Sequence, residues 1–96
     1  MFQHMTKLRQ SIRAKQKMQI HLGGDVYKLR PLALDYWGRL WTLAAWSEAT
    51  SGFMTLRIDL IDSADIIPAA FVDEAGKTLI DYLSWNKAQN LVLIST

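Results

Sequence analysis

The chain has 96 residues, of which 50% are hydrophobic and 21% are charged, and its formal net charge is +2. This composition is typical of one small globular domain and not of a disordered chain. The sequence contains no cysteine, which excludes disulfides, thiolate nucleophiles and cysteine-based zinc sites. Its apolar runs are too short for a membrane span and no signal-peptide pattern opens it, so we expect a cytoplasmic protein.

The charges are distributed unevenly along the chain. Residues 1–39 hold eight Lys or Arg against two Asp, whereas residues 40–96 hold three Lys or Arg against seven Asp or Glu. A basic half can indicate a nucleic-acid or acidic partner. The alternative, which we favour, is that the two halves complement each other within the fold or across a dimer.

The first predicted element is an amphipathic helix over residues 5–17. Thr6 can cap it, and Met5, Leu8 and Ile12 form an apolar stripe at helical spacing. Basic side chains without any acidic one cover the rest of the helix. They suit either contact with a phosphate backbone or a solvated face, and we favour the solvated face because no aromatic residue lies among them.

Two strands are predicted next, over residues 18–22 and 26–35. Gly23 and Gly24 between them supply the positive φ angles that a tight hairpin turn requires. Pro31 cannot donate a ladder hydrogen bond, so we expect the second strand to lie at a sheet edge or to bend there.

The stretch 36–46, YWGRLWTLAAW, holds three of the four tryptophans of the chain. Trp37-Gly38-Arg39 is typical of a tight turn, and the residues after it are apolar on both faces of a period-two pattern. A segment of this kind predicts a central strand that is buried on both sides.

The remaining elements are shorter. Residues 53–61 predict a half-buried strand in which Met54, Leu56, Ile58 and Leu60 share one face, and residues 64–67 a fifth strand closed by Pro68. Residues 78–86 predict a helix with Leu79, Tyr82 and Leu83 on one face, preceded by Asp73 and Glu74, whose charges favour its N-terminus. Residues 91–94 are an apolar run that suits an edge strand or an oligomer contact. The order is helix, five strands, helix, which predicts a mainly β protein: a small barrel or a strongly bent sheet with a helix at each end.

No catalytic signature is present in the sequence. It contains no nucleophile elbow, P-loop, zinc-protease motif or dinucleotide fingerprint. His4 and His21 are too few for a histidine-based metal site. Gly23-Gly24 lacks the geometry of a phosphate-binding loop, because it joins two strands and does not open a helix. We therefore expect neither an enzyme nor a cofactor.

Several segments, taken together, resemble the WYL domain, the ligand-sensing half of many bacterial transcription regulators with an N-terminal helix-turn-helix. The resemblance covers roughly residues 8–83. We expect residues 1–96 to form a single domain, with residues 84–96 as an extra tail. The matching residues are Pro31-Leu32, Trp37-Gly38, Trp41-Thr42-Leu43 in the place of the name-giving triplet, Ala44-Ala45-Trp46, Phe53, Arg57, Asp59, Ile61 and Gly76-Lys77-Thr78-Leu79.

The resemblance implies an Sm-like, SH3-type small five-stranded β-barrel with an N-terminal and a C-terminal helix. It also implies a module that binds an anionic effector, such as a nucleotide or single-stranded nucleic acid, and that often works as a dimer. This chain departs from the family pattern where Tyr27, Met54 and Leu60 replace arginines, where His21 replaces a tyrosine, and where Ser47 replaces a cysteine.

Of the basic pocket that the resemblance implies, Arg57 remains, with Arg30 as a second cation. We expect His21 and Tyr27 to complete the ligand-binding set, with Trp37 or Tyr36 as a stacking surface for a base. The loss of the other arginines favours an alternative function, a protein interaction or dimerisation module with a degenerate ligand pocket, supported by Met54, Leu60 and residues 91–94. In either case the 96 residues leave no room for a helix-turn-helix, so we expect a DNA-binding partner or a longer regulator.

Overall fold

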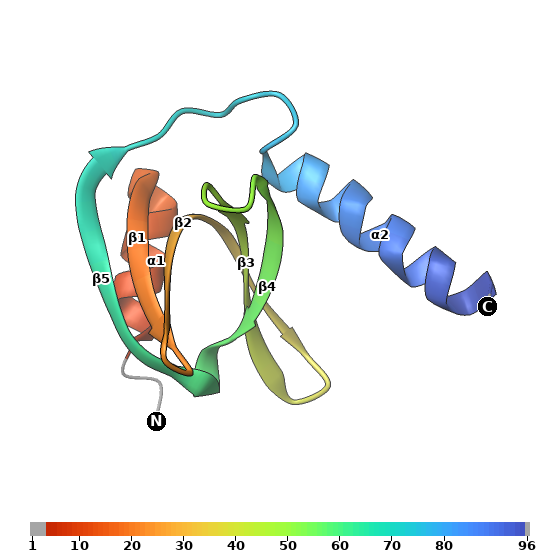
Figure 1. The fold of residues 1–96 in the computed structure, drawn as a ribbon, viewed down its shortest axis with the longest axis horizontal. Helices are drawn as coiled ribbons and strands as arrows, with labels where there is room; N and C mark the ends of the chain where they lie inside the picture. The colour runs from red at the N-terminus through yellow and green to blue at the C-terminus, as the bar shows by residue number, and fades with distance from the viewer. Residues whose placement is uncertain (1–3, 96) are drawn as a thin grey trace.

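The computed structural model describes the backbone of residues 4–95 and the side chains of residues 4–36 and 38–88. Five antiparallel strands form one sheet, in the order β4-β3-β2-β1-β5, with a helix at each end of the chain (Figure 1). The elements are α1 (Met5–Ala14), β1 (Gln16–Leu22), β2 (Asp25–Trp37), β3 (Leu40–Ser47), β4 (Gly52–Arg57), the 3₁₀ turn η1 (Ile58–Leu60), β5 (Ile61–Ala70) and α2 (Leu79–Ser95).

The sheet is strongly bent but open. Its outer strands β4 and β5 do not pair with each other within the described chain, so the closed barrel that we expected is absent and the bent sheet is the correct alternative. The predicted strand 53–61 is divided in the structure: β4 ends at Arg57, the 3₁₀ turn η1 takes residues 58–60, and Ile61 begins β5. After this turn β5 pairs with β1 and leaves β4 as an edge.

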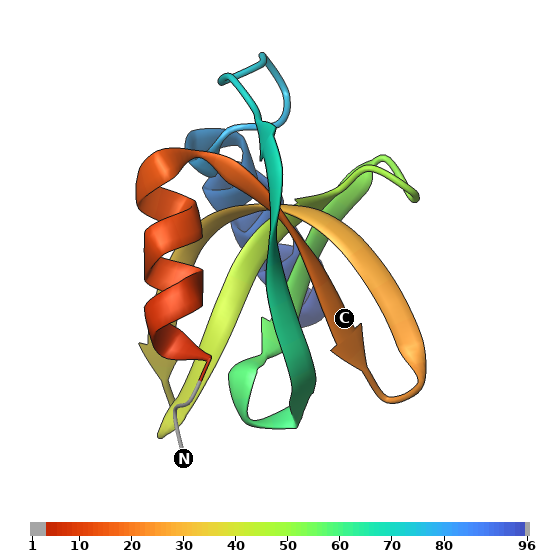
Figure 2. The same cartoon turned by 90° about the vertical axis from the view of Figure 1, so that its left-hand side faces the viewer.

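Helix α1 closes the concave side of the sheet, where it lies against β1, β2 and β5 (Figure 2). Its predicted stripe is confirmed: Met5 and Leu8 are buried and Ile12 packs against the core. The helix is shorter than expected because Lys15 takes a left-handed conformation (φ 52°, ψ 52°) and ends it. The helix begins at Met5 as predicted, but the predicted cap at Thr6 is wrong, since Thr6 lies inside the helix and His4 holds the N-cap position.

The two-glycine hairpin between β1 and β2 is confirmed, with φ angles of +59° at Gly23 and +86° at Gly24. Strand β2 is an inner strand of the sheet, so the edge position considered for Pro31 is wrong and the predicted bend is right. The register of β2 against β3 shifts between Pro31 and Ala33, and pairing with β1 ends at Leu29. Pro31 therefore lies where β2 has already left β1 and needs no donor on that side.

Strand β3 is confirmed as the central strand that is buried on both faces. Leu43 and Ala45 are fully buried in the core on the concave face, and Ala44 is 3% exposed on the opposite face. The first turns of helix α2 contact that opposite face through an aromatic cluster, in which the ring of Phe53 lies 5.0 Å from Trp46 and 5.7 Å from Tyr82, centroid to centroid. The hydroxyl groups of Thr55 and Tyr82 are hydrogen bonded at 2.7 Å and add a polar contact.

The apolar stripe predicted for residues 53–61 is correct only in part. Met54 packs against the core and Leu56 and Ile58 are buried, but Leu60 is 50% exposed because η1 breaks the period of two. Strand β5 is longer than predicted and includes Pro68. The proline is tolerated because β5 is an edge strand and its register against β1 shifts between the pairs Gln16–Ala70 and Met18–Ile66.

Helix α2 begins where expected, at a capping box formed by Thr78 and Asp81. Asp81 also accepts hydrogen bonds from the backbone N–H groups of Gly76 and Thr78, which hold its pKa below the ordinary value. The helix continues to Ser95, so an edge strand at 91–94 is wrong; the side chains there lie outside the described residues. Tyr82 is buried, whereas Leu79 and Leu83 of the predicted apolar face are 38% and 55% exposed.

The basic and acidic halves of the sequence complement each other within the fold, which is the interpretation that we favoured. Five ion pairs of the described residues join a cation of the first 39 residues to an acid of the rest. These are Lys7–Asp65, Lys15–Asp73, Lys17–Glu48, Arg30–Glu48 and Arg30–Glu74. Asp73 and Glu74 thus bind the segment 71–78 to the rest of the domain instead of serving the helix N-terminus.

The burial of Leu8 yields a first prediction. Leu8→Ala should lower the free energy of unfolding by about 2–5 kcal/mol, because its fully buried side chain leaves a cavity between α1 and the sheet. Urea denaturation measures the loss. Gln10→Ala, on the exposed face of the same helix, is the control and should change stability little; equal stability of the two variants would contradict the packing described.

Candidate functional site

Of the residues expected to bind a ligand, those with described side chains do not converge on one site. His21 pairs with Val26 across the hairpin and lies on the convex face of the sheet, where its Nδ1 is 3.1 Å from the Ser63 hydroxyl. Tyr27 pairs with Ile20 and packs against the core on the opposite face. Trp37 ends β2, and its side chain lies outside the described residues.

Arg57 lies at the end of β4 with a half-exposed side chain. Its guanidinium forms a two-point ion pair with Asp59, through Nε to Oδ1 at 3.1 Å and Nη2 to Oδ2 at 2.6 Å. This contact raises the pKa of Arg57 and lowers that of Asp59. An anion at Arg57 must therefore compete with a carboxylate of the same chain.

Arg30 is held more firmly, and its side chain is only 11% exposed. Its Nη1 lies 2.8 Å from a carboxylate oxygen of Glu74, its Nε lies 3.3 Å from one of Glu48, and its guanidinium is 5.7 Å from the ring centre of Phe71. Burial lowers the pKa of Arg30, but the hydrogen bonds to the two glutamates outweigh this effect and raise it. Arg30 therefore joins β2 to the segment 71–78 and is not a free ligand for an anion.

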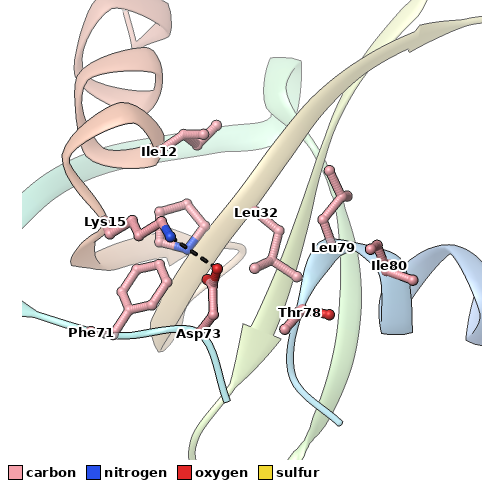
Figure 3. A pocket seen from close by; sticks show the side chains of 9 residues that line it. Ile12, Lys15, Leu32, Phe71, Asp73, Thr78, Leu79 and Ile80 are labelled. Atoms are coloured by element: carbon pink, nitrogen blue, oxygen red, sulfur yellow. Dashed lines mark hydrogen bonds and ion pairs between the residues drawn. The ribbon is translucent and has the colours of Figure 1, made fainter. Parts of the chain in front are cut away.

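A cavity with a volume of about 340 Å³ lies between α1, β2 and the residues that lead into α2 (Figure 3). Its lining is mostly apolar. The lining residues are Ile12, Lys15, Pro31, Leu32, Phe71, Asp73, Thr78, Leu79 and Ile80. At one wall the Lys15 ammonium lies 2.9 Å from the Asp73 carboxylate, and Leu32, Leu79 and Ile80 lie across from this pair (Figure 3).

A second hollow, of about 240 Å³, lies further along α1 and is lined by Arg9, Ile12, Arg13 and Leu34. Neither arginine takes part in an ion pair within the described residues, in contrast to Lys7 and Lys15 of the same segment. The two arginines are one helical turn apart and so share a face of α1.

None of the residues that line these two cavities was expected as a ligand contact. The sequence offers little signal for them, because the cavity walls come from segments far apart in the chain, as Lys15 and Asp73 show with a separation of 58 residues. Only the basic face of the first helix was visible in the sequence.

No His, Asp and Glu side chains of the described residues group in threes or more as a metal site would need. Likewise, no helix within the part of the chain that the structure describes is long and apolar enough to cross a membrane.

The sequence profile of the WYL domain matches residues 3–66 of the chain. The chain belongs to the WYL domain family. The WYL domain described here is also similar to proteasome accessory factor B/C (PafBC) of Arthrobacter aurescens, with a TM-score of 0.70 and 19% sequence identity. The likeness covers 77% of this chain but 12% of PafBC, and at this identity it shows a shared fold. No curated protein matches the chain by sequence.

The ion pairs of this WYL domain predict how its stability depends on pH. The hydrogen bond from Lys17, together with Arg30, lowers the pKa of Glu48 from its ordinary 4.5 against the effect of burial. The hydrogen bond from Arg30, followed by the one from Lys77, lowers the pKa of Glu74. Since the folded-state pKa values are depressed, this stabilisation is present above about pH 4.5 and is lost as the pH falls through the folded-state values.

We expect the double variant Glu48→Gln/Glu74→Gln to be less stable at neutral pH and to lose less stability on acidification than the parent. Thermal unfolding at a series of pH values measures both effects. Asp25→Asn is the control, because Asp25 forms no ion pair within the described residues. Parallel curves for parent and double variant would contradict the role given to the two glutamates.

Proposed function

We propose that this WYL domain is the ligand-sensing part of a transcription regulator and that it binds an anionic effector, such as a nucleotide or single-stranded nucleic acid. Membership of the family supports the regulatory role. We also interpret the bent five-stranded sheet as an opened form of the Sm-like barrel. DNA recognition falls to a partner or to a longer regulator, because α1 and α2 are separated by the whole sheet and form no helix-turn-helix within the described residues.

The observation that carries the anionic effector is the pair Arg9 and Arg13 beside the hollow on α1. Two guanidinium groups one turn apart can hold the oxygens of one phosphate between them. An aromatic pair lies nearby: Tyr36 and Trp41 are cross-strand partners whose ring centroids are 5.0 Å apart. Tyr36 lies two residues after Leu34 on β2, on the same face and about 7 Å further along the strand. The Tyr36–Trp41 pair can stack against a base.

The role is one of binding in the cytoplasm and not of catalysis. The contact between Ser63 and His21 has the residue types of a nucleophile and its base. It lies on the convex face of the sheet, however, and neither residue lines either of the two cavities. We therefore assign it no chemical step.

The effector can be tested by titrating the protein with labelled single-stranded DNA and with a panel of nucleotides, at low and at physiological salt. We expect saturable binding that Arg9→Gln/Arg13→Gln weakens by about tenfold or more, because each charged hydrogen bond is worth at least that much. Arg57→Ala tests the position favoured by the family resemblance. If Arg57→Ala alone abolishes binding, the ligand occupies that face of the sheet instead.

Lys28→Gln/Lys87→Gln serves as the control for net charge, since it also removes two exposed cations, one of β2 and one of α2. Equal losses in this control and in the α1 variants, together with binding that vanishes at physiological salt, would reduce the effect to non-specific electrostatics. Absence of binding at both salt concentrations would contradict the anionic effector.

A second function, a protein interaction or dimerisation module, is favoured by the surface around α2. The side chains of Val72, Ile80 and Leu83 are 72%, 75% and 55% exposed, and α2 extends away from the sheet after its first turns (Figure 1). Of the residues first expected to support this function, Met54 packs against the core and is not available, whereas Leu60 is half-exposed.

Light scattering over a concentration series tests this second function. A dimer is expected to dissociate in the variant Ile80→Glu/Leu83→Glu, because charges on an apolar interface are costly to bury. Val26→Glu, at an exposed apolar position in the β1–β2 hairpin, is the matched control. A parent protein that stays monomeric at high concentration would exclude self-association through α2.

A further inference from the structure

The 340 Å³ cavity combines an apolar body with one cation and one anion. Lys15 and Asp73 are the charged side chains of its lining, and their Nζ and Oδ2 atoms are 2.9 Å apart. Both side chains are more than half exposed, at 52% and 59%. The pair can therefore separate to admit a ligand at small cost, because exposed ion pairs contribute little free energy.

The backbone fixes the position of this ion pair. Lys15 ends α1 in the left-handed conformation, with φ at 52° and ψ at 52°, where glycine is the usual residue. A residue held in this region costs about 1–3 kcal/mol, and such residues gather at functional sites. The carbonyl of Lys15 accepts a hydrogen bond from the N–H of Phe71 at 2.8 Å, which ties the ends of α1 and β5 together at the cavity.

The charge balance of the cavity selects the chemical class of its ligand. A simple anion would pair with Lys15 but would lie against the carboxylate of Asp73, and a simple cation would meet the opposite conflict. A molecule with one carboxylate and one ammonium group satisfies both side chains at once. Across the cavity Leu32, Leu79 and Ile80 form an apolar wall for the rest of the molecule (Figure 3).

We infer that this cavity binds a small zwitterion with an apolar body, of the class of an α-amino acid with an apolar side chain. Its carboxylate pairs with Lys15, its ammonium group pairs with Asp73, and its side chain enters the space bounded by Phe71 and Leu32. The volume is near the lower end of the roughly 300–1,000 Å³ typical of small-molecule sites, which fits a ligand smaller than a nucleotide.

This inference goes beyond the anionic effector and does not depend on it. The two cavities share Ile12 but differ in their charged groups, since Arg9 and Arg13 line the smaller one alone. Substitution of these two arginines should leave zwitterion binding unchanged, so failure of one proposal can be distinguished from failure of the other.

The test compares L-phenylalanine and L-leucine with two analogues, 3-phenylpropanoate and phenethylamine, each of which lacks one of the two charges. Calorimetry or amide chemical shifts of the parent protein measure binding. We expect saturable binding of at least one amino acid, shift changes centred on the cavity residues, and binding of both analogues that is weaker by about two- to fivefold. This comparison needs no variant and so is independent of any folding defect.

Variants then locate the charges. Lys15→Met and Asp73→Asn should each weaken binding of the amino acid by about two- to fivefold, as expected for exposed ion pairs. The matched control is Lys7→Met and Asp65→Asn, which remove the Lys7–Asp65 ion pair, between α1 and β5 and outside the cavity. Absence of saturable binding, equal binding of an amino acid and its carboxylate analogue, or equal losses in the test and control variants would each overturn the inference.

Discussion

The ion pairs of Arg30 are the interaction on which the arrangement of the C-terminal third depends. The segment 71–78 has no helix or strand of its own, yet it forms one wall of the larger cavity and leads into α2. Glu74 anchors it to Arg30 of β2, and the Arg30 guanidinium lies against the ring of Phe71. Because the Arg30 side chain is nearly buried, loss of its carboxylate partners would leave a cation without compensation. The same contacts explain why Arg30, a ligand candidate in the sequence, serves the fold.

Local patterns in the sequence determine most of the fold. The alternation of apolar residues, the paired glycines of the first hairpin and the capping box at Thr78 each depend on neighbours in the chain, and each was predicted or is visible there. The errors occur where tertiary structure overrides a local pattern. Ile58 and Leu60 continue a period of two, but the turn that carries the chain from β4 to β5 converts them to a 3₁₀ turn and exposes Leu60. After this turn β5 pairs with β1 and not with β4, so the sheet stays open within the described chain.

The candidate site was less predictable than the fold, for two different reasons. One part could have been deduced: a two-residue hairpin at Gly23 and Gly24 places Tyr27 opposite Ile20, so Tyr27 shares the buried face and His21 the other. These two residues therefore could not bind one ligand on the same face of the sheet. The other part had no local signal. Lys15 meets Asp73 and Arg30 meets Glu74 across 58 and 44 residues, and no spacing rule connects such positions.

The two ion pairs that hold the segment 71–78 differ in exposure. This difference suits the less exposed pair to a structural role and the more exposed pair to the proposed ligand binding. Arg30–Glu74 involves a side chain that is 11% exposed, whereas both partners of Lys15–Asp73 are more than half exposed. A ligand can therefore take the place of the Lys15–Asp73 contact while Glu74, one residue further along, keeps the segment attached. Leu79 and Ile80 line the same cavity and also contribute to the exposed apolar surface at the start of α2. A ligand bound in the cavity would change the surface that a partner or a second copy would meet, so the two proposed functions, ligand sensing and protein interaction, are compatible with each other.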